Sequence, residues 1–216
     1  MKIPFKPNQR LLFIGDSITD CERKRPIGER SWSGLGKGYV NYVDSILAAS
    51  MPKTPVVVLN TGSSGNRVTD LASRWQTDVL DLKPNWLSVM IGINDVWRQF
   101  DSGMGRDQVD PEQFELVYRE LLEKSLPQLD GLVLMTPYYL ESNRQDPMRA
   151  KMDIYGTITK RLAAEFDAIF VDTQAAFDHY LEHHPTQCLC GDRVHPNEVG
   201  HMILARAFLG AVGANI

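Results

Sequence analysis

Five short runs of apolar and β-branched residues recur along the chain, at residues 11–15, 55–60, 86–91, 131–136 and 169–172. Each run has the length of a strand. None alternates strictly between apolar and polar positions, as a strand with one solvent-exposed face would. The runs therefore predict strands that are buried on both faces.

Segments with the helical spacing of apolar residues follow most of these runs. The spacing predicts helices over residues 39–49, 68–80, 111–129, 148–166 and 196–212. Pro111 directly after Asp110 is typical of a helix that begins with a capping side chain. Strands that alternate with helices predict an α/β fold, a three-layer α/β/α sandwich with a five-stranded parallel sheet.

Binding residues of such a fold should follow the carboxyl ends of its strands, because an open α/β sheet has its crevice there. The longest expected loops, at residues 20–37, 99–110 and 138–147, all start at that edge. The 216 residues contain no repeat, low-complexity tract or linker, so a single domain over residues 1–216 is expected.

Composition and charge exclude several classes of function. The formal net charge is −4, and the densest basic stretch, at residues 23–25, is interpreted as a solvated loop, so no nucleic-acid partner is expected. No apolar stretch approaches the roughly 18 residues of a membrane span, and the first residues lack a signal peptide's apolar block. Cys21, Cys188 and Cys190 are too few for a disulfide framework. A reduced, cytoplasmic protein is therefore expected.

Four polar clusters occupy positions that the predicted fold brings to one edge of the sheet. They lie at residues 15–19, 60–66 and 92–95, after the first three strands, and at residues 192–196, just before the last helix. Since the carboxyl ends of parallel strands share an edge, these clusters are expected to converge on one site.

The residue types in these clusters are those of nucleophilic ester hydrolysis. Ser17 could attack a carbonyl with His195 as general base, while Asp192 orients the imidazole and stabilises its charged form. The oxyanion of the intermediate needs hydrogen-bond donors. Asn94 offers a side-chain amide for it, and Ser17 and Gly65 offer backbone N–H groups.

Structural interpretations of the same residues remain open. Ser17 could be an ordinary helix cap, and Gly62 competes with Gly65 for the oxyanion. Asp16 and Asp95 are interpreted as structural carboxyl groups. The density of potential ligands near the end of the chain would also suit zinc, although no cofactor or metal is expected. These ligands are His183, His184, Cys188, Cys190, Asp192 and His195.

The four clusters resemble the sequence blocks of the SGNH (GDSL-like) serine hydrolases, which are Gly-Asp-Ser, Asn-x-x-x-x-Gly, Gly-x-Asn-Asp and Asp-x-x-His. The resemblance implies a flavodoxin-like SGNH hydrolase fold. It places the nucleophile at Ser17, the oxyanion donors at Gly65 and Asn94, and the remaining catalytic residues at Asp192 and His195. The Gly-x-Ser-x-Gly elbow of the α/β-hydrolases is absent.

Residues 12–21, 90–100 and 201–208 resemble more narrowly the bacterial acetyl xylan esterases of this class. The resemblance implies a cytoplasmic homo-oligomer that removes acetyl groups from xylo-oligosaccharides. One departure is Gly191, where a tryptophan is expected, and this difference puts the exact sugar preference in doubt.

Aromatic residues after the strands are candidates for the wall of a sugar pocket. Trp97 follows the cluster that contains Asn94, and Tyr138 and Tyr139 follow the fourth strand. Two other functions remain open: a short-chain acyl esterase or thioesterase of the same fold, and a catalytically silent carbohydrate-binding protein. Acetate release and acyl chain-length preference discriminate between them.

Overall fold

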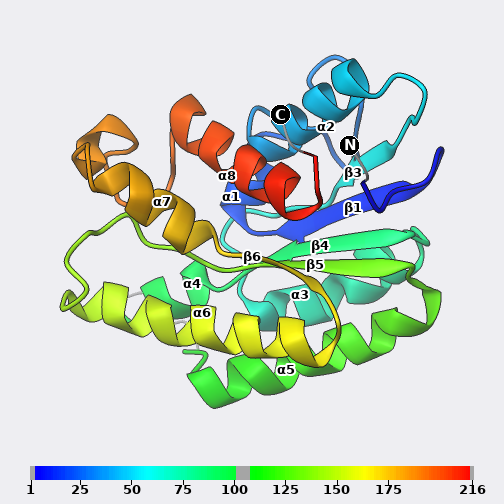
Figure 1. Ribbon diagram of the computed structural model, residues 1–216. Helices are drawn as coiled ribbons and strands as arrows, with labels where there is room; N and C mark the ends of the chain where they lie inside the picture. The colour runs from blue at the N-terminus through cyan, green and yellow to red at the C-terminus, as the bar shows by residue number, and fades with distance from the viewer. Residues whose placement is uncertain (1–2, 101–107, 215–216) are drawn as a thin grey trace.

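A six-stranded sheet forms the centre of the molecule (Figure 1). The computed structural model describes residues 3–100 and 108–214. In spatial order the sheet is β2-β3-β1-β4-β5-β6, and all neighbouring strands are parallel except β2 and β3. The strands are β1 (Arg10–Gly15), β2 (Gly28–Glu29), β3 (Val57–Asn60), β4 (Trp86–Met90), β5 (Gly131–Met135) and β6 (Ile169–Val171).

The five predicted strands are all present, and the prediction of five strands is wrong by one. The additional strand, β2, has only two residues and pairs antiparallel with the end of β3, where Gly28 lies opposite Asn60. Two residues carry no apolar pattern, so this strand leaves no signal in the sequence.

Helices cover both faces of the sheet, as predicted. In Figure 1, α2, α7 and α8 lie on one face and α3, α5 and α6 on the other. The helices are α1 (Ser17–Asp20), α2 (Tyr39–Ser50), α3 (Val68–Trp75), α4 (Ile93–Trp97), α5 (Pro111–Ser125), α6 (Pro147–Glu165), α7 (Thr173–Leu181) and α8 (Glu198–Ala211). None of the helices in residues 3–100 and 108–214 is both long and apolar enough to cross a membrane.

The predicted helices are confirmed with two changes at their ends. The helix expected over residues 68–80 is α3 followed by a π-helical turn, Gln76–Leu80, and α5 gives way to a 3₁₀ turn, Leu126–Gln128. The Asp110 side chain accepts a hydrogen bond from the Gln113 N–H at 2.8 Å, which confirms the expected cap of α5. Most of the loop expected at 99–110 lies outside the described residues.

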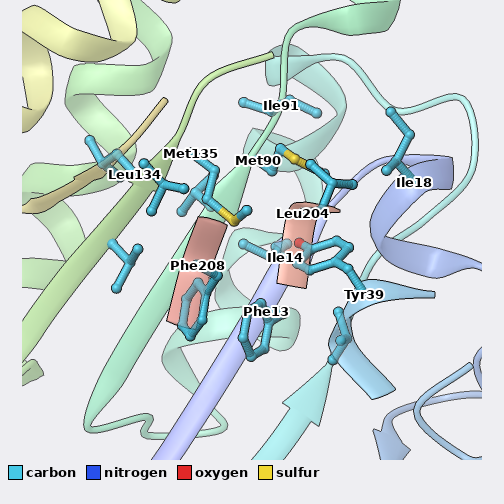
Figure 2. Close-up of a cluster of buried hydrophobic side chains, with 14 of the residues drawn as sticks. Phe13, Ile14, Ile18, Tyr39, Met90, Ile91, Leu134, Met135, Leu204 and Phe208 are labelled. Carbon is cyan, nitrogen blue, oxygen red and sulfur yellow. The ribbon is translucent and has the colours of Figure 1, made fainter. Parts of the chain in front are cut away.

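Buried side chains fix α8 and α2 against the central strands (Figure 2). Phe13 of β1 meets Tyr39 of α2 and Phe208 of α8, with ring centroids 5.7 and 5.0 Å apart. Ile14 and Leu204 are also fully buried in this cluster. Each such side chain contributes about 1.5–3 kcal/mol by leaving water. The packing therefore holds the segment before α8, which contains His195, close to the end of β1.

The sheet changes its direction of winding between β1 and β4. The chain moves outward from β1 to β3 on one side and from β4 through β5 to β6 on the other. Such a switch point is where open α/β sheets bind their ligands. The residues that follow β1 and β4, including Ser17 and Asn94, therefore lie where the topology predicts a site.

Candidate active site

Ser17 is the first residue of the short helix that follows β1 directly. Asp16 caps this helix, because its carboxylate accepts the Ile18 N–H at 3.0 Å. Gly15 runs so close to β4 that an added Cβ would lie 2.3 Å from the Met90 carbonyl oxygen. Only glycine fits this approach, which brings Ser17 to the switch point while leaving its side chain partly accessible.

The histidine and aspartate predicted to act with Ser17 meet it in space. The Ser17 Oγ lies 2.9 Å from His195 Nε2, although 178 positions separate the two residues. On the other side of the ring, His195 Nδ1 lies 2.6 Å from Asp192 Oδ2. This chain of contacts is the arrangement in which an imidazole can take a proton from a serine hydroxyl.

The turn at residues 192–195 is organised by the Asp192 carboxylate itself. Its Oδ1 accepts the N–H groups of Val194 and His195, both at 2.9 Å. Burial raises the pKa of Asp192, but the bonds from the His195 ring and these backbone N–H groups outweigh it and lower the pKa. The carboxylate therefore stays ionised at neutral pH and can stabilise a charged imidazole.

Residues 138–141 support this turn from behind, a contact that the sequence did not predict. The Leu140 N–H donates to the Arg193 carbonyl at 3.0 Å, and the Tyr138 hydroxyl donates to the Val194 carbonyl at 3.2 Å. Arg193 has a φ of 64° and pairs with Glu141 at 2.9 Å. Because some 50 residues of chain separate these partners, no local pattern could reveal them.

The oxyanion candidates come from the loops after β3 and β4. The Ser63 N–H donates to the Gly15 carbonyl at 3.0 Å, which holds the loop at residues 62–66 beside the Ser17 segment. Asn94 is buried, and its Nδ2 donates to the Asn66 carbonyl at 3.0 Å, so one amide hydrogen remains for another acceptor. The three segments that contain Ser17, Gly65 and Asn94 are thus joined by hydrogen bonds.

The two glycines of the middle loop differ in what their N–H groups do. The Gly62 N–H donates to Asn60 Oδ1 at 2.8 Å, and its Cα packs so tightly on α1 that a Cβ would lie 2.4 Å from the Asp20 nitrogen. Gly65 has a φ of 79°, and within the described chain its N–H donates to no other group. Gly65 is therefore the better donor for an oxyanion.

Arg74 of α3 links these loops and was missed by the sequence analysis. Its guanidinium donates to the carbonyls of Gly15 and Thr61 at 3.1 and 2.6 Å and to the Asn66 side chain at 2.6 Å. Asp78 pairs with it one helical turn on. In the sequence Arg74 lies on the polar face of an amphipathic helix, where an arginine usually faces solvent, so no signal marks this role.

Two buried carboxyl groups lie beneath the site. Burial raises the pKa of Asp16 to about 7, and the same cause raises the pKa of Asp95 to about 7. Asp95 accepts the Val68 N–H at 3.0 Å through Oδ1, while its Oδ2 has no hydrogen-bond partner among the described residues. Both carboxyl groups are buried and accept backbone N–H groups, which suits the structural roles interpreted from the sequence.

These carboxyl groups should make the protein's stability depend on pH. At pH values between the ordinary aspartate pKa of 3.8 and the folded-state pKa of about 7, Asp95 keeps a proton in the folded protein that the unfolded chain has released. The unfolding free energy therefore falls as the pH rises through this range. Relative to Asp95→Asn, the wild type should lose up to about 4 kcal/mol between pH 4 and pH 7. Urea unfolding of both proteins across this range measures the difference, and parallel pH profiles would contradict it.

The aromatic pocket candidates fall into two groups. The ring of the partly buried Trp97 lies edge-on to the His195 ring, with centroids 6.0 Å apart, so Trp97 borders the site. Tyr138 is fully buried and packs on Phe177, and Tyr139 is nearly buried. Tyr138 therefore offers no surface to a sugar and Tyr139 offers little, and Tyr138 instead supports the turn that contains His195.

The zinc alternative finds no geometric support. Among the described residues no three His, Cys, Asp or Glu side chains are grouped so that they could hold a metal ion. His184 instead stacks on Tyr180, and Asp192 and His195 contact each other.

The interpretation of residues 23–25 as a solvated loop is wrong for Arg23. This side chain is buried and donates to the carbonyls of Gly62 and Pro26 at 2.7 and 2.6 Å. Burial lowers its pKa to about 10, so it stays charged at neutral pH and braces the loop at residues 62–66 from outside.

The fold agrees with comparisons to known proteins. Residues 13–203 match the GDSL-like lipase/acylhydrolase family, and the chain belongs to this family. An acetylxylan esterase from Geobacillus stearothermophilus is 52% identical over 206 residues, which are 95% of this chain and 94% of that protein.

Solved structures are similar to this chain over nearly its whole length. The crystal structure of Axe2, an acetylxylan esterase from Geobacillus stearothermophilus, matches with a TM-score of 0.95 and 51% identity, covering 99% of this chain and 97% of that one. The crystal structure of LAE5, an α/β hydrolase from the metagenome of Lake Arreo in Spain, matches with a TM-score of 0.95 and 45% identity, covering 99% of both chains. Three further Axe2 structures are described as catalytic mutants, in which a serine, an aspartate or a histidine is replaced by alanine.

Proposed function

We propose that the protein is a carboxylic ester hydrolase that removes acetyl groups from acetylated xylo-oligosaccharides. The observation that carries this proposal is the contact of Ser17 Oγ with His195 Nε2 at 2.9 Å, continued by the contact of His195 with Asp192. The sugar substrate is supported by the likeness, at 52% identity over 95% of the chain, to an acetylxylan esterase.

In the proposed reaction Ser17 is first acetylated, and the acetyl-serine is then hydrolysed. The Ser17 oxygen attacks the acetyl carbonyl carbon while His195 Nε2 takes the hydroxyl proton, and the N–H groups of Ser17, Gly65 and Asn94 stabilise the oxyanion. His195 gives this proton to the oxygen of the leaving sugar. A water molecule, deprotonated by His195, then attacks the acetyl-serine, which releases acetate and restores the Ser17 hydroxyl.

Replacing Asn94 by alanine tests the oxyanion role. The substitution should lower kcat on the order of 10²–10³-fold with KM little changed, because the amide bonds more strongly to the oxyanion than to the ester carbonyl. Steady-state kinetics with para-nitrophenyl acetate measure this. A rise in KM at unchanged kcat would instead assign Asn94 to substrate binding.

The substrate is tested by measuring acetate release from acetylated xylo-oligosaccharides and from para-nitrophenyl esters of increasing acyl length. We expect release from the oligosaccharides and an acyl preference for acetyl. Activity on the small esters alone, or a preference beyond butyryl, would favour a short-chain esterase or thioesterase. Oligosaccharide binding without any acetate release would indicate a silent carbohydrate-binding protein.

The proposal includes a cytoplasmic location and self-association. Free thiols at Cys21, Cys188 and Cys190 suit a reducing compartment, and exposed Val199 and Met202 on the outer side of α8 offer an apolar surface to a second copy. Cell fractionation and analytical ultracentrifugation test the two points separately.

A further inference from the structure

Trp32 stands out as an exposed apolar side chain on an unusual turn. It is 94% exposed, more than any other large apolar residue among those described. The turn closes with a bond from the Gly34 N–H to the Ser31 carbonyl at 2.6 Å, and both central residues have positive φ, 36° at Trp32 and 62° at Ser33. Glycine, asparagine and aspartate normally occupy such positions, so a bulky indole there is an outlier that points to a function.

The loop that presents Trp32 is anchored firmly to α2. The Arg30 guanidinium donates through Nε and Nη2 to the two oxygens of Asp44, at 2.7 and 2.6 Å. Asp44 is buried, and a two-bond contact of this kind fixes orientation as well as position. The tryptophan is therefore held out from the surface by a rigid base.

A hollow of about 280 Å³ lies between this loop and α2. Polar side chains line it together with Trp32, and within the described chain four of them make no side-chain hydrogen bond. These unpaired side chains are Ser31, Ser33, Asn41 and Ser45. The hollow thus combines one flat apolar face with several unused hydrogen-bonding groups.

This combination fits a sugar better than a protein partner. A pyranose ring has an apolar C–H face that can stack on an indole and hydroxyl groups that need donors and acceptors. The cores of protein interfaces are depleted of serine, aspartate and alanine, and this hollow contains Ser45, Asp44 and Ala48. None of the other exposed large apolar residues among those described lines it.

We propose that the hollow at Trp32 is an accessory binding site for the sugar chain of the substrate, separate from the site at Ser17. The inference rests on the proposed function for its ligand class. Gly36 packs on the end of α1, where an added Cβ would lie 2.6 Å from the Cys21 carbonyl oxygen. Trp32 is four residues from Gly36, a span of about 14 Å or less. Cys21 directly follows the short helix that begins at Ser17, so a chain of several sugar units bound at Trp32 can extend to Ser17, which raises the effective concentration of its acetyl groups there.

The test compares Trp32→Ala and Trp32→Tyr with wild type on acetylated xylohexaose and on para-nitrophenyl acetate. Loss of the ring should raise KM for the oligosaccharide about threefold to tenfold at unchanged kcat, whereas tyrosine should restore most of the binding. Kinetics with the small ester should not change. Leu116→Ala, which removes another exposed apolar side chain, is the matched control and should leave every parameter unchanged.

Binding of unacetylated xylohexaose, followed by tryptophan fluorescence, gives a second measurement that needs no catalysis. The wild type should show a change that Trp32→Ala loses; no change in the wild type would overturn the accessory site even if deacetylation is confirmed. Equal KM values of wild type and Trp32→Ala for the oligosaccharide would also overturn it. If, at unchanged KM, Trp32→Ala also formed a smaller assembly than wild type in ultracentrifugation, Trp32 would be assigned to contacts between copies. Wild type that cleaves only para-nitrophenyl acetate but still binds xylohexaose through Trp32 would reject the proposed substrate and keep the sugar site.

Discussion

Replacing Ser17 by alanine should reduce kcat for para-nitrophenyl acetate by about 10⁵-fold or more while leaving the protein folded. The proposed reaction begins with a covalent bond to the Ser17 oxygen, and among the residues that the structure describes no other hydroxyl contacts His195. The helix start should survive, because the cap of α1 is the Asp16 side chain and not Ser17. Activity assays together with Tm values measure both parts of this expectation.

Ser73→Ala is the matched control for this variant. Ser73 is an exposed serine on α3 whose hydroxyl donates to the Asp70 carbonyl within the same helix. Its loss should change neither kcat nor, by more than about 0.5 kcal/mol, the stability. Retained turnover in folded Ser17→Ala protein would remove Ser17 as the nucleophile.

Asp192→Asn should lower kcat by on the order of 10³–10⁴-fold through the protonation state of the histidine. The amide oxygen can still accept the N–H groups of Val194 and His195, so the turn keeps its shape. Its NH₂ group, however, would face His195 Nδ1 in place of Oδ2 and donate to it. The imidazole would then carry its proton on Nε2, where it cannot accept the proton of Ser17.

A control for this acid-to-amide change is Asp110→Asn at the start of α5. Asparagine caps a helix as well as aspartate does, so this variant should keep its activity and stability. NMR of the imidazole nitrogens in Asp192→Asn should show the proton on Nε2. An active Asp192→Asn enzyme would mean that Asp192 does not set this tautomer.

The sequence predicted the elements that bury an apolar face and the site residues that follow strands. Periodic burial is a local property, so the five longer strands and the helices α2, α3, α5, α6 and α8 could be located directly, whereas α1, α4 and α7 were not predicted. Residues at strand ends could be brought together on topology alone, and Ser17, Asp192 and His195 do meet in the structure.

The features of the site that the sequence did not predict depend on contacts between distant segments of the chain. Arg74 looks like a surface residue until the carbonyls of Gly15 and Thr61 lie beside it. Tyr138 follows a strand, as a pocket residue would, but its ring turns into the core and its hydroxyl contacts Val194. The direction in which a side chain points after a strand depends on packing partners that the sequence does not place.

Gly191 directly precedes the catalytic candidate Asp192, and its own position has room for a side chain. A Cβ added there would meet no atom within 4 Å, and the backbone conformation is open to any amino acid. Asp192 keeps its bonds to His195 through its own side chain and through backbone N–H groups beyond the glycine. A side chain can therefore be introduced at residue 191 without a clash at its Cβ, while the bonds that hold Asp192 and His195 together stay as they are.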